Sequence, residues 1–161
     1  MRSIGFATAA GALALSACAT TPRIDGLPES ISYETGPCFG ACPVYVVTVH
    51  ADGSGMFEGR RFTAATGPRD FRVTPEQYRA FAARLAPLRP ASGSVRYSGA
   101  PLCRAMATDL PSVDVKWRSR GREQELYFYY GCDMEGKRAI AERLGSAPDL
   151  LPIISFIGGQ P

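Results

Sequence analysis

Histidine and long apolar runs are scarce in this sequence. His50 is the only histidine among 161 residues, which removes the usual routes to metal hydrolases and to catalytic triads with a histidine base. No Gly-x-Ser-x-Gly motif accompanies it, and no spaced pair of carboxylates stands out for glycosidase chemistry. The net charge of +3 is too small to indicate nucleic-acid binding. We therefore expect no enzymatic activity, no cofactor and no nucleic-acid partner.

What the sequence does contain is the composition of a globular domain. Hydrophobic residues make up 45% of the chain and charged residues 20%. These fractions exclude a disordered acidic tail, a collagen-like repeat and a protein that crosses a membrane several times. Domains usually have about 100–200 residues, so a chain of 161 residues fits one domain.

The first 17 residues have the features of a bacterial lipoprotein signal peptide. Arg2 precedes a short apolar stretch, residues 4–15, which is well below the roughly 20 residues that span a bilayer. The stretch ends in Leu15-Ser16-Ala17-Cys18, which resembles a lipobox. In proteins with this motif the chain is cut before the cysteine, which is then acylated. We predict that residues 1–17 are removed and that Cys18 is the lipid anchor. The alternative is an ordinary signal peptide with a chance cysteine.

Residues 18–29 are predicted to tether the domain to the membrane. Several acyl chains on one residue exceed the two signals needed for stable attachment. The segment is rich in small residues, threonine and proline, as linkers often are. An aspartate after the lipidated cysteine commonly favours the inner membrane, so Ala19 is permissive for the outer membrane. We expect a single domain over residues 30–161 that faces the periplasm.

Four cysteines remain after Cys18, and an even number in an exported chain favours disulfides. Four cysteines allow three pairings. We favour Cys38–Cys42, because these residues are close in sequence, and Cys103–Cys132, because this pair brackets one predicted hairpin. Loop entropy would contribute about 2 and about 3.5 kcal/mol, respectively. The crossed pairings stay open.

Hydrophobic alternation and β-branched residues predict most of the secondary structure. Strands are expected from residue 31 and over residues 43–50, 56–62, 69–73, 113–118 and 125–130. Thr74, Pro75 and Gln77 predict a helix start with a capping box. A second helix is expected over residues 134–144 with Gly145 as its C-cap, and residues 91–108 are expected to form a loop.

The order of these elements predicts the fold class. Each half of the chain has a hairpin followed by a helix, without a repeat at the residue level. This order favours an α+β fold, mainly an antiparallel sheet with two principal helices packed on one face. The disulfides would staple this domain.

Several motifs together resemble a known family. Residues 36–45 (GPCFGACPVY) precede a hairpin with Asp52-Gly53 and then Glu58-Gly59, and residues 108–112 (TDLPS) and 129–132 (YYGC) follow later. The combination resembles the family called domain of unknown function 6438, which occurs in bacterial envelope lipoproteins. The resemblance covers most of residues 30–145. It implies a compact α+β lipoprotein domain and carries no established activity.

The segment Cys38-x3-Cys42-Pro43 also resembles the copper-binding loop of Sco-type chaperones, in which two thiolates and a distant histidine bind the metal. Soft thiolates select Cu(I), and His50 is the only candidate for a third ligand. However, His50 lies at the far end of a predicted strand about 20 Å long. We therefore favour a structural disulfide. A periplasmic copper-binding or thiol-redox protein that uses Cys38 and Cys42 is the alternative.

A basic cluster marks the tip of one predicted hairpin. It consists of Lys116, Arg118, Arg120 and Arg122. This candidate patch suits anionic lipid headgroups, lipopolysaccharide phosphates or cell-wall polymers, at about 1 kcal/mol per cation near the surface. The alternative is a solvated strand face that acidic neighbours partly neutralise. We predict a lipid-anchored envelope lipoprotein without enzymatic activity, which binds or scaffolds an envelope protein or an anionic envelope polymer.

Overall fold

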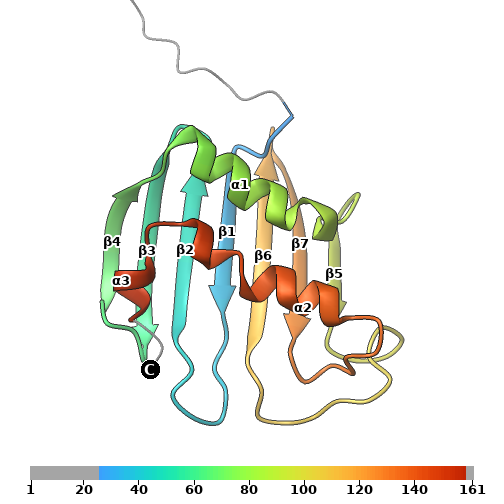
Figure 1. Ribbon diagram of the computed structural model, residues 1–161. Coiled ribbons are helices and arrows are strands. Elements are labelled where there is room, and N and C mark those ends of the chain that lie inside the picture. Colours follow the sequence, from blue (N-terminus) through green and yellow to red (C-terminus); the bar gives the residue numbers. More distant parts are fainter. Residues whose placement is uncertain (1–25, 159–161) are drawn as a thin grey trace, which may run out of the picture.

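Alternating apolar and polar residues build a seven-stranded sheet, in the order β4-β3-β2-β1-β6-β7-β5. The computed structural model describes residues 26–158, and Figure 1 shows helices on only one face of this sheet. The strands are β1 (Ser30–Thr35), β2 (Val44–His50), β3 (Ser54–Arg61), β4 (Gly67–Arg72), β5 (Ser94–Tyr97), β6 (Ser112–Ser119) and β7 (Arg122–Tyr129). Neighbouring strands are antiparallel except β5 and β7, which are parallel.

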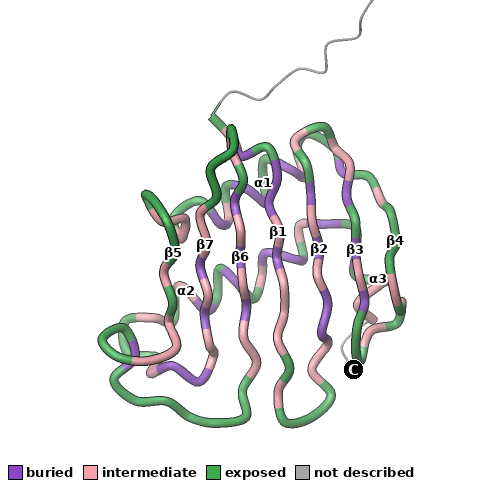
Figure 2. Tube along the Cα trace, turned by 180° about the vertical axis from the view of Figure 1, so that it is seen from behind, coloured by how far each residue is buried: buried purple, intermediate pink, exposed green. Residues whose placement is uncertain are grey.

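The strand register places the core side chains in rows across the helix-covered face. One row crosses five strands and consists of Phe57, Val47, Tyr33, Val115 and Leu126. All five are buried, while the residues between them along the strands are more exposed. Seen from the uncovered side, this alternation runs along the central strands (Figure 2). Most of the polar side chains of the strands therefore lie on the uncovered face.

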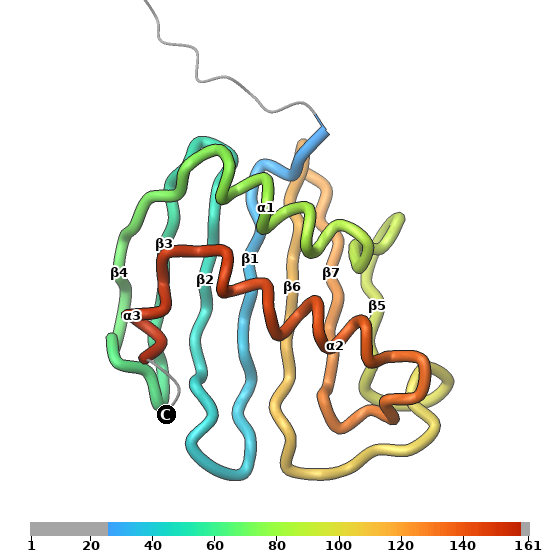
Figure 3. Tube along the Cα trace, in the orientation of Figure 1, coloured from blue at the N-terminus to red at the C-terminus, as the bar shows by residue number. Residues whose placement is uncertain are grey.

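Helices from two parts of the chain cover the apolar face. They are α1 (Pro75–Leu85), α2 (Arg138–Gly145) and α3 (Ile154–Ile157), with the 3-10 turns η1 (Ala86–Leu88) and η2 (Pro148–Leu150). Figure 3 shows α1 crossing the upper half of the sheet and the segment from α2 to α3 crossing the lower half. The predicted capping box opens α1, because the Thr74 hydroxyl accepts from the Gln77 amide at 3.2 Å and the Thr74 amide donates to the Gln77 side chain at 2.9 Å. Within the described range, no helix is long and apolar enough to cross a membrane.

The predicted α+β class is confirmed, and three local predictions are wrong. The second helix begins at Arg138 instead of residue 134, because Gly136 adopts a φ of 72° that a helix does not allow. The helix includes Gly145, and Ser146 is its C-cap. The segment expected to be a loop contains β5, a short parallel strand at the sheet edge. The predicted signal peptide (residues 1–17), Cys18 and residues 19–25 of the predicted tether lie outside the described residues.

Replacing Phe81 with alanine tests whether α1 is part of the core. Phe81 is fully buried on α1 against the sheet, so Phe81→Ala should lower the free energy of unfolding by about 3–5 kcal/mol. Phe39 is 88% exposed, so the same change there should cost less than about 0.5 kcal/mol. Urea unfolding of both variants measures the difference, and similar losses would contradict this packing.

Candidate functional site

Three loops gather at the end of the sheet where β1 ends and β6 begins. They connect β1 to β2 (residues 36–43), β5 to β6 (98–111) and β7 to α2 (130–137). Figure 1 shows them together at the lower end of the molecule. We call these three loops the loop platform.

Backbone hydrogen bonds join the loops of the platform directly. The Phe39 amide donates to the Asp109 carbonyl at 3.0 Å and ties the first loop to the second. The Ala107 amide donates to the Gly131 carbonyl at 2.8 Å and ties the second loop to the third. A side chain at Gly131 would overlap the carbonyl oxygen of Ala107, which explains the glycine in the YYGC motif. The platform is thus one connected unit.

Two disulfides fix the same loops. Cys38 and Cys42 close the first loop with a Cα–Cα distance of 5.8 Å. Cys103 and Cys132 join the second loop to the third with a Cα–Cα distance of 5.3 Å. This is the pairing favoured from the sequence. The loops of the platform are therefore held by covalent bonds as well as by backbone hydrogen bonds.

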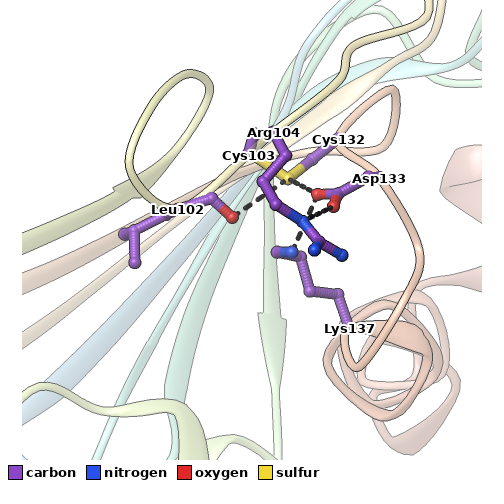
Figure 4. The surroundings of a disulfide bond; sticks show 6 residues. All are labelled: Leu102, Cys103, Arg104, Cys132, Asp133 and Lys137. Atoms are coloured by element: carbon purple, nitrogen blue, oxygen red, sulfur yellow. Dashed lines mark hydrogen bonds and ion pairs between the residues drawn. A yellow bond between two sulfur atoms is a disulfide. The ribbon is translucent and has the colours of Figure 1, made fainter.

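The charges beside the second disulfide neutralise one another (Figure 4). Lys137 donates to Asp133 at 2.8 Å, and Arg104 lies 3.4 Å from the same carboxylate and 2.5 Å from Glu135. The hydrogen bond from Lys137, supported by Arg104, lowers the pKa of Asp133. These four charges beside the disulfide are consequently paired, whereas Asp109 of the second loop has no ion-pair partner among the described residues.

The four cysteines in the described part of the chain are all in disulfides and offer no thiolate to a metal. In residues 26–158 one group of potential ligands has suitable spacing, namely Cys103, Cys132 and Asp133. Its two sulfurs are bonded to each other, so neither is a thiolate ligand. His50 is exposed at the end of β2 opposite to Cys42, about 20 Å away along the strand. The structure therefore does not bring His50 and the Cys38–Cys42 loop into one site.

Large apolar side chains are exposed on the loop platform. The exposed fractions are 88% for Phe39, 51% for Met106, 40% for Leu110, 38% for Leu102 and 37% for Met134. Apolar side chains gathered in one region of a surface commonly mark interaction sites. Sequence reasoning singled out none of these five side chains as a contact, because each lies in a predicted loop, at a predicted helix start or in a motif used only for the family resemblance. Apolar residues in a segment closed by a cysteine pair were the available signal.

Three of the four cations in the predicted patch lie at the opposite end of the sheet, Lys116 lies midway along β6 in register with Ser32, and the four do not share one face. Lys116 and Arg118 both lie on the uncovered face of β6, one on each side of a residue that points to the helices. Arg120 occupies the turn with a φ of 48°. Arg122 is in register with Ser119, on the helix-covered side. Arg118, Arg120 and Arg122 thus surround the β6–β7 turn, and Lys116 lies apart from them.

A carboxyl group with a perturbed pKa lies on the uncovered face. Asp114 is in register with Glu34 of β1 and with Tyr127 of β7. Its Oδ1 atom is hidden from solvent and has no hydrogen-bond partner among the described residues. Burial raises its pKa to about 7, the neighbouring negative charge of Glu125 adds to this shift, and Lys116 opposes it. Asp114 therefore holds a proton more tightly than an exposed aspartate.

The comparisons with known proteins identify one family. The family model described as Domain of unknown function (DUF6438) matches residues 29–147. This range includes all seven strands of the sheet, α1, α2 and the loop platform. Searches of curated proteins and of solved structures gave no match.

Removing each disulfide should show how much it contributes to the free energy of unfolding. The Cys103→Ala/Cys132→Ala variant opens a loop of 29 residues and should lose about 3.5 kcal/mol in free energy of unfolding. The Cys38→Ala/Cys42→Ala variant opens a loop of 4 residues and should lose about 2 kcal/mol. Urea unfolding without reductant measures both values. Equal stability of the first variant and the native protein would mean that this disulfide does not hold the platform.

The Asp114→Asn variant tests the raised pKa. Because the folded state binds this proton more tightly, the contribution of Asp114 to stability falls as the pH rises from about 4 to about 7. Asparagine removes the buried charge, so the variant should gain more in Tm at about pH 8 than at about pH 4. The same gain in Tm at both pH values would show that ionisation of Asp114 does not destabilise the folded protein.

Proposed function

Since the chain belongs to the DUF6438 family, a family without an assigned activity, we propose its function from the surfaces of this molecule. We propose that it is a lipid-anchored envelope lipoprotein that binds an envelope protein through the loop platform. The observation that carries this proposal is the set of five large apolar side chains exposed on loops that two disulfides hold.

The rigidity of the platform favours binding. Ordering flexible loops at an interface costs free energy for each immobilised side chain. Here the disulfides and the backbone bonds between loops have already limited the backbone motion. Apolar side chains on such a surface can be buried against a partner at a lower entropic cost.

The chemistry of the platform favours an apolar protein surface as the partner. Arg104, Asp133, Glu135 and Lys137 are already paired with one another, so they leave little net charge for an anionic polymer. Phe39 and Met106 offer an aromatic ring and a flexible thioether, both of which are common in protein interfaces. These features favour a protein over a cell-wall polymer at this end.

The position of the platform suits a protein anchored by its N-terminal segment. The described chain begins at Gly26 at the upper end of the molecule in Figure 1, and the platform lies at the lower end. A lipid on Cys18 would attach the upper end to the membrane. The platform would then extend away from the membrane, toward proteins of the periplasm.

Photo-cross-linking in the bacterium tests this function. Benzoylphenylalanine replaces Met106, which is 51% exposed on the platform, or Met56, which is 45% exposed on the uncovered sheet face. We expect one cross-linked product of defined mass from position 106 and little from position 56. The additional change Phe39→Ser should lower the yield from position 106 about tenfold, as expected for the loss of one apolar anchor.

The matched positions make the result decisive. Both replace a methionine of similar exposure, so they differ mainly in the surface that they sample. Equal cross-linking from both positions, or a yield unchanged by Phe39→Ser, would contradict binding through the platform.

A further inference from the structure

We propose that the β6–β7 turn, with Arg118, Arg120 and Arg122, lies against the anionic phosphate headgroups of the membrane that holds the lipid anchor. We call this end of the molecule the anchor end. The inference rests on the proposed lipid anchor and adds a second contact, made by the folded domain itself. It also assigns an orientation to the molecule on the membrane.

Hydrogen bonds connect the N-terminal segment to the β6–β7 hairpin. The Glu29 amide donates to the Arg118 carbonyl at 2.8 Å. The Glu29 carbonyl accepts from the Ala51 amide, in the β2–β3 turn, at 2.9 Å. The segment that precedes β1 therefore enters the sheet between these two turns. Any anchor upstream of Gly26 is therefore attached to this end of the sheet.

The reach of the tether keeps the β6–β7 turn close to the membrane. Gly26 lies eight positions after Cys18, and a fully extended chain over eight such steps spans at most about 29 Å. This limit is a few Debye lengths at physiological salt, where one Debye length is about 8 Å. The tether itself thus holds the basic turn near the headgroups, and no long-range electrostatic attraction is needed to bring it there.

The β6–β7 hairpin carries a concentrated positive charge. Residues 116–123 contain four cations and one anion, a net charge of +3 that equals the net charge of the whole chain. Arg118 pairs with Glu123 at 2.8 Å, whereas Arg120 and Arg122 have no ion-pair partner in the described part of the chain. These two guanidinium groups are therefore available for an external anion.

A further arginine reinforces the charge from the helix side. Arg89 follows η1 and donates to the Gln124 side chain at 2.8 Å and to the Ser119 hydroxyl at 3.2 Å. Both acceptors are neutral, so these bonds hold the hairpin without cancelling the charge of Arg89. The acidic residues at this end are Glu29, Asp52 and Glu123, and Asp52 accepts hydrogen bonds from Ser54.

The contrast with the loop platform supports headgroups as the occupant. The platform has exposed apolar side chains and paired charges, whereas the anchor end has unpaired arginines around a turn. Guanidinium groups bind phosphate oxygens with two parallel hydrogen bonds, which suits a layer of lipid phosphates. No exposed large apolar side chain lies in residues 116–123, so this turn offers a protein partner little to bury.

Arginine-specific labelling of the lipidated protein tests this orientation. The protein is extracted from the bacterial envelope and reconstituted into vesicles of phosphatidylcholine alone, or of phosphatidylcholine with phosphatidylglycerol. Phenylglyoxal then labels exposed guanidinium groups, and mass spectrometry quantifies each site. We expect about fivefold lower labelling of Arg120 and Arg122 on the anionic vesicles. Labelling of Arg104 and Arg138, near the platform, should be the same on both vesicles.

Two further measurements link any protection to the charges. High salt should restore the labelling of Arg120 on anionic vesicles, because it screens the contact. In the Arg120→Gln/Arg122→Gln variant the protection of Arg118 should also disappear. The matched Arg104→Gln/Arg138→Gln variant should keep the protection of Arg120.

The outcomes separate this inference from the lipid anchor. A protein that floats with both vesicles and whose Arg120 is labelled equally on both retains its anchor, and the orientation is then wrong. A protein that floats with neither vesicle has no working lipid anchor, which overturns the proposed attachment and the orientation together.

Discussion

Strand β1 lies in the middle of the sheet and links its two parts. It pairs with β2 on one edge and with β6 on the other, so it joins the two halves of the sheet. Ile31 and Tyr33 of this strand are buried, and the Tyr33 hydroxyl donates to the Leu144 carbonyl in α2 at 3.0 Å. Burial raises the pKa of this hydroxyl, so it stays protonated as a donor. A strand of six residues also separates the two ends of the molecule by about 20 Å.

The two ends differ in chemistry because different connections meet there. The chain enters at one end beside the β6–β7 turn, whose unpaired arginines would repel one another without solvent or an external anion. At the other end β1 continues into the Cys38–Cys42 loop, and the long connection before β6 packs against the loop after β7. There covalent bonds and paired charges allow apolar side chains to remain exposed on a fixed surface.

The fold follows from the sequence wherever local chemistry determines it. The capping box at Thr74 and the strand over residues 113–118 depend on neighbours along one helix or strand, and both are confirmed. Strand β5 was missed because four residues are too few for a periodic signal, and its pairing with β7 is a contact between distant parts of the sequence. The loop platform was missed for a similar reason. Its members are far apart in sequence, and only the sheet topology and the Cys103–Cys132 disulfide bring them together.

An intact mass of the protein isolated from its native envelope is the most direct test of this account. The protein would be alkylated without reductant before the measurement. A chain that begins at Cys18, carries several acyl chains and has no alkylated cysteine is the predicted result. A chain without lipid would contradict the anchor. Alkylated Cys38 and Cys42 would contradict the fixed loop platform and favour metal or thiol chemistry at that loop.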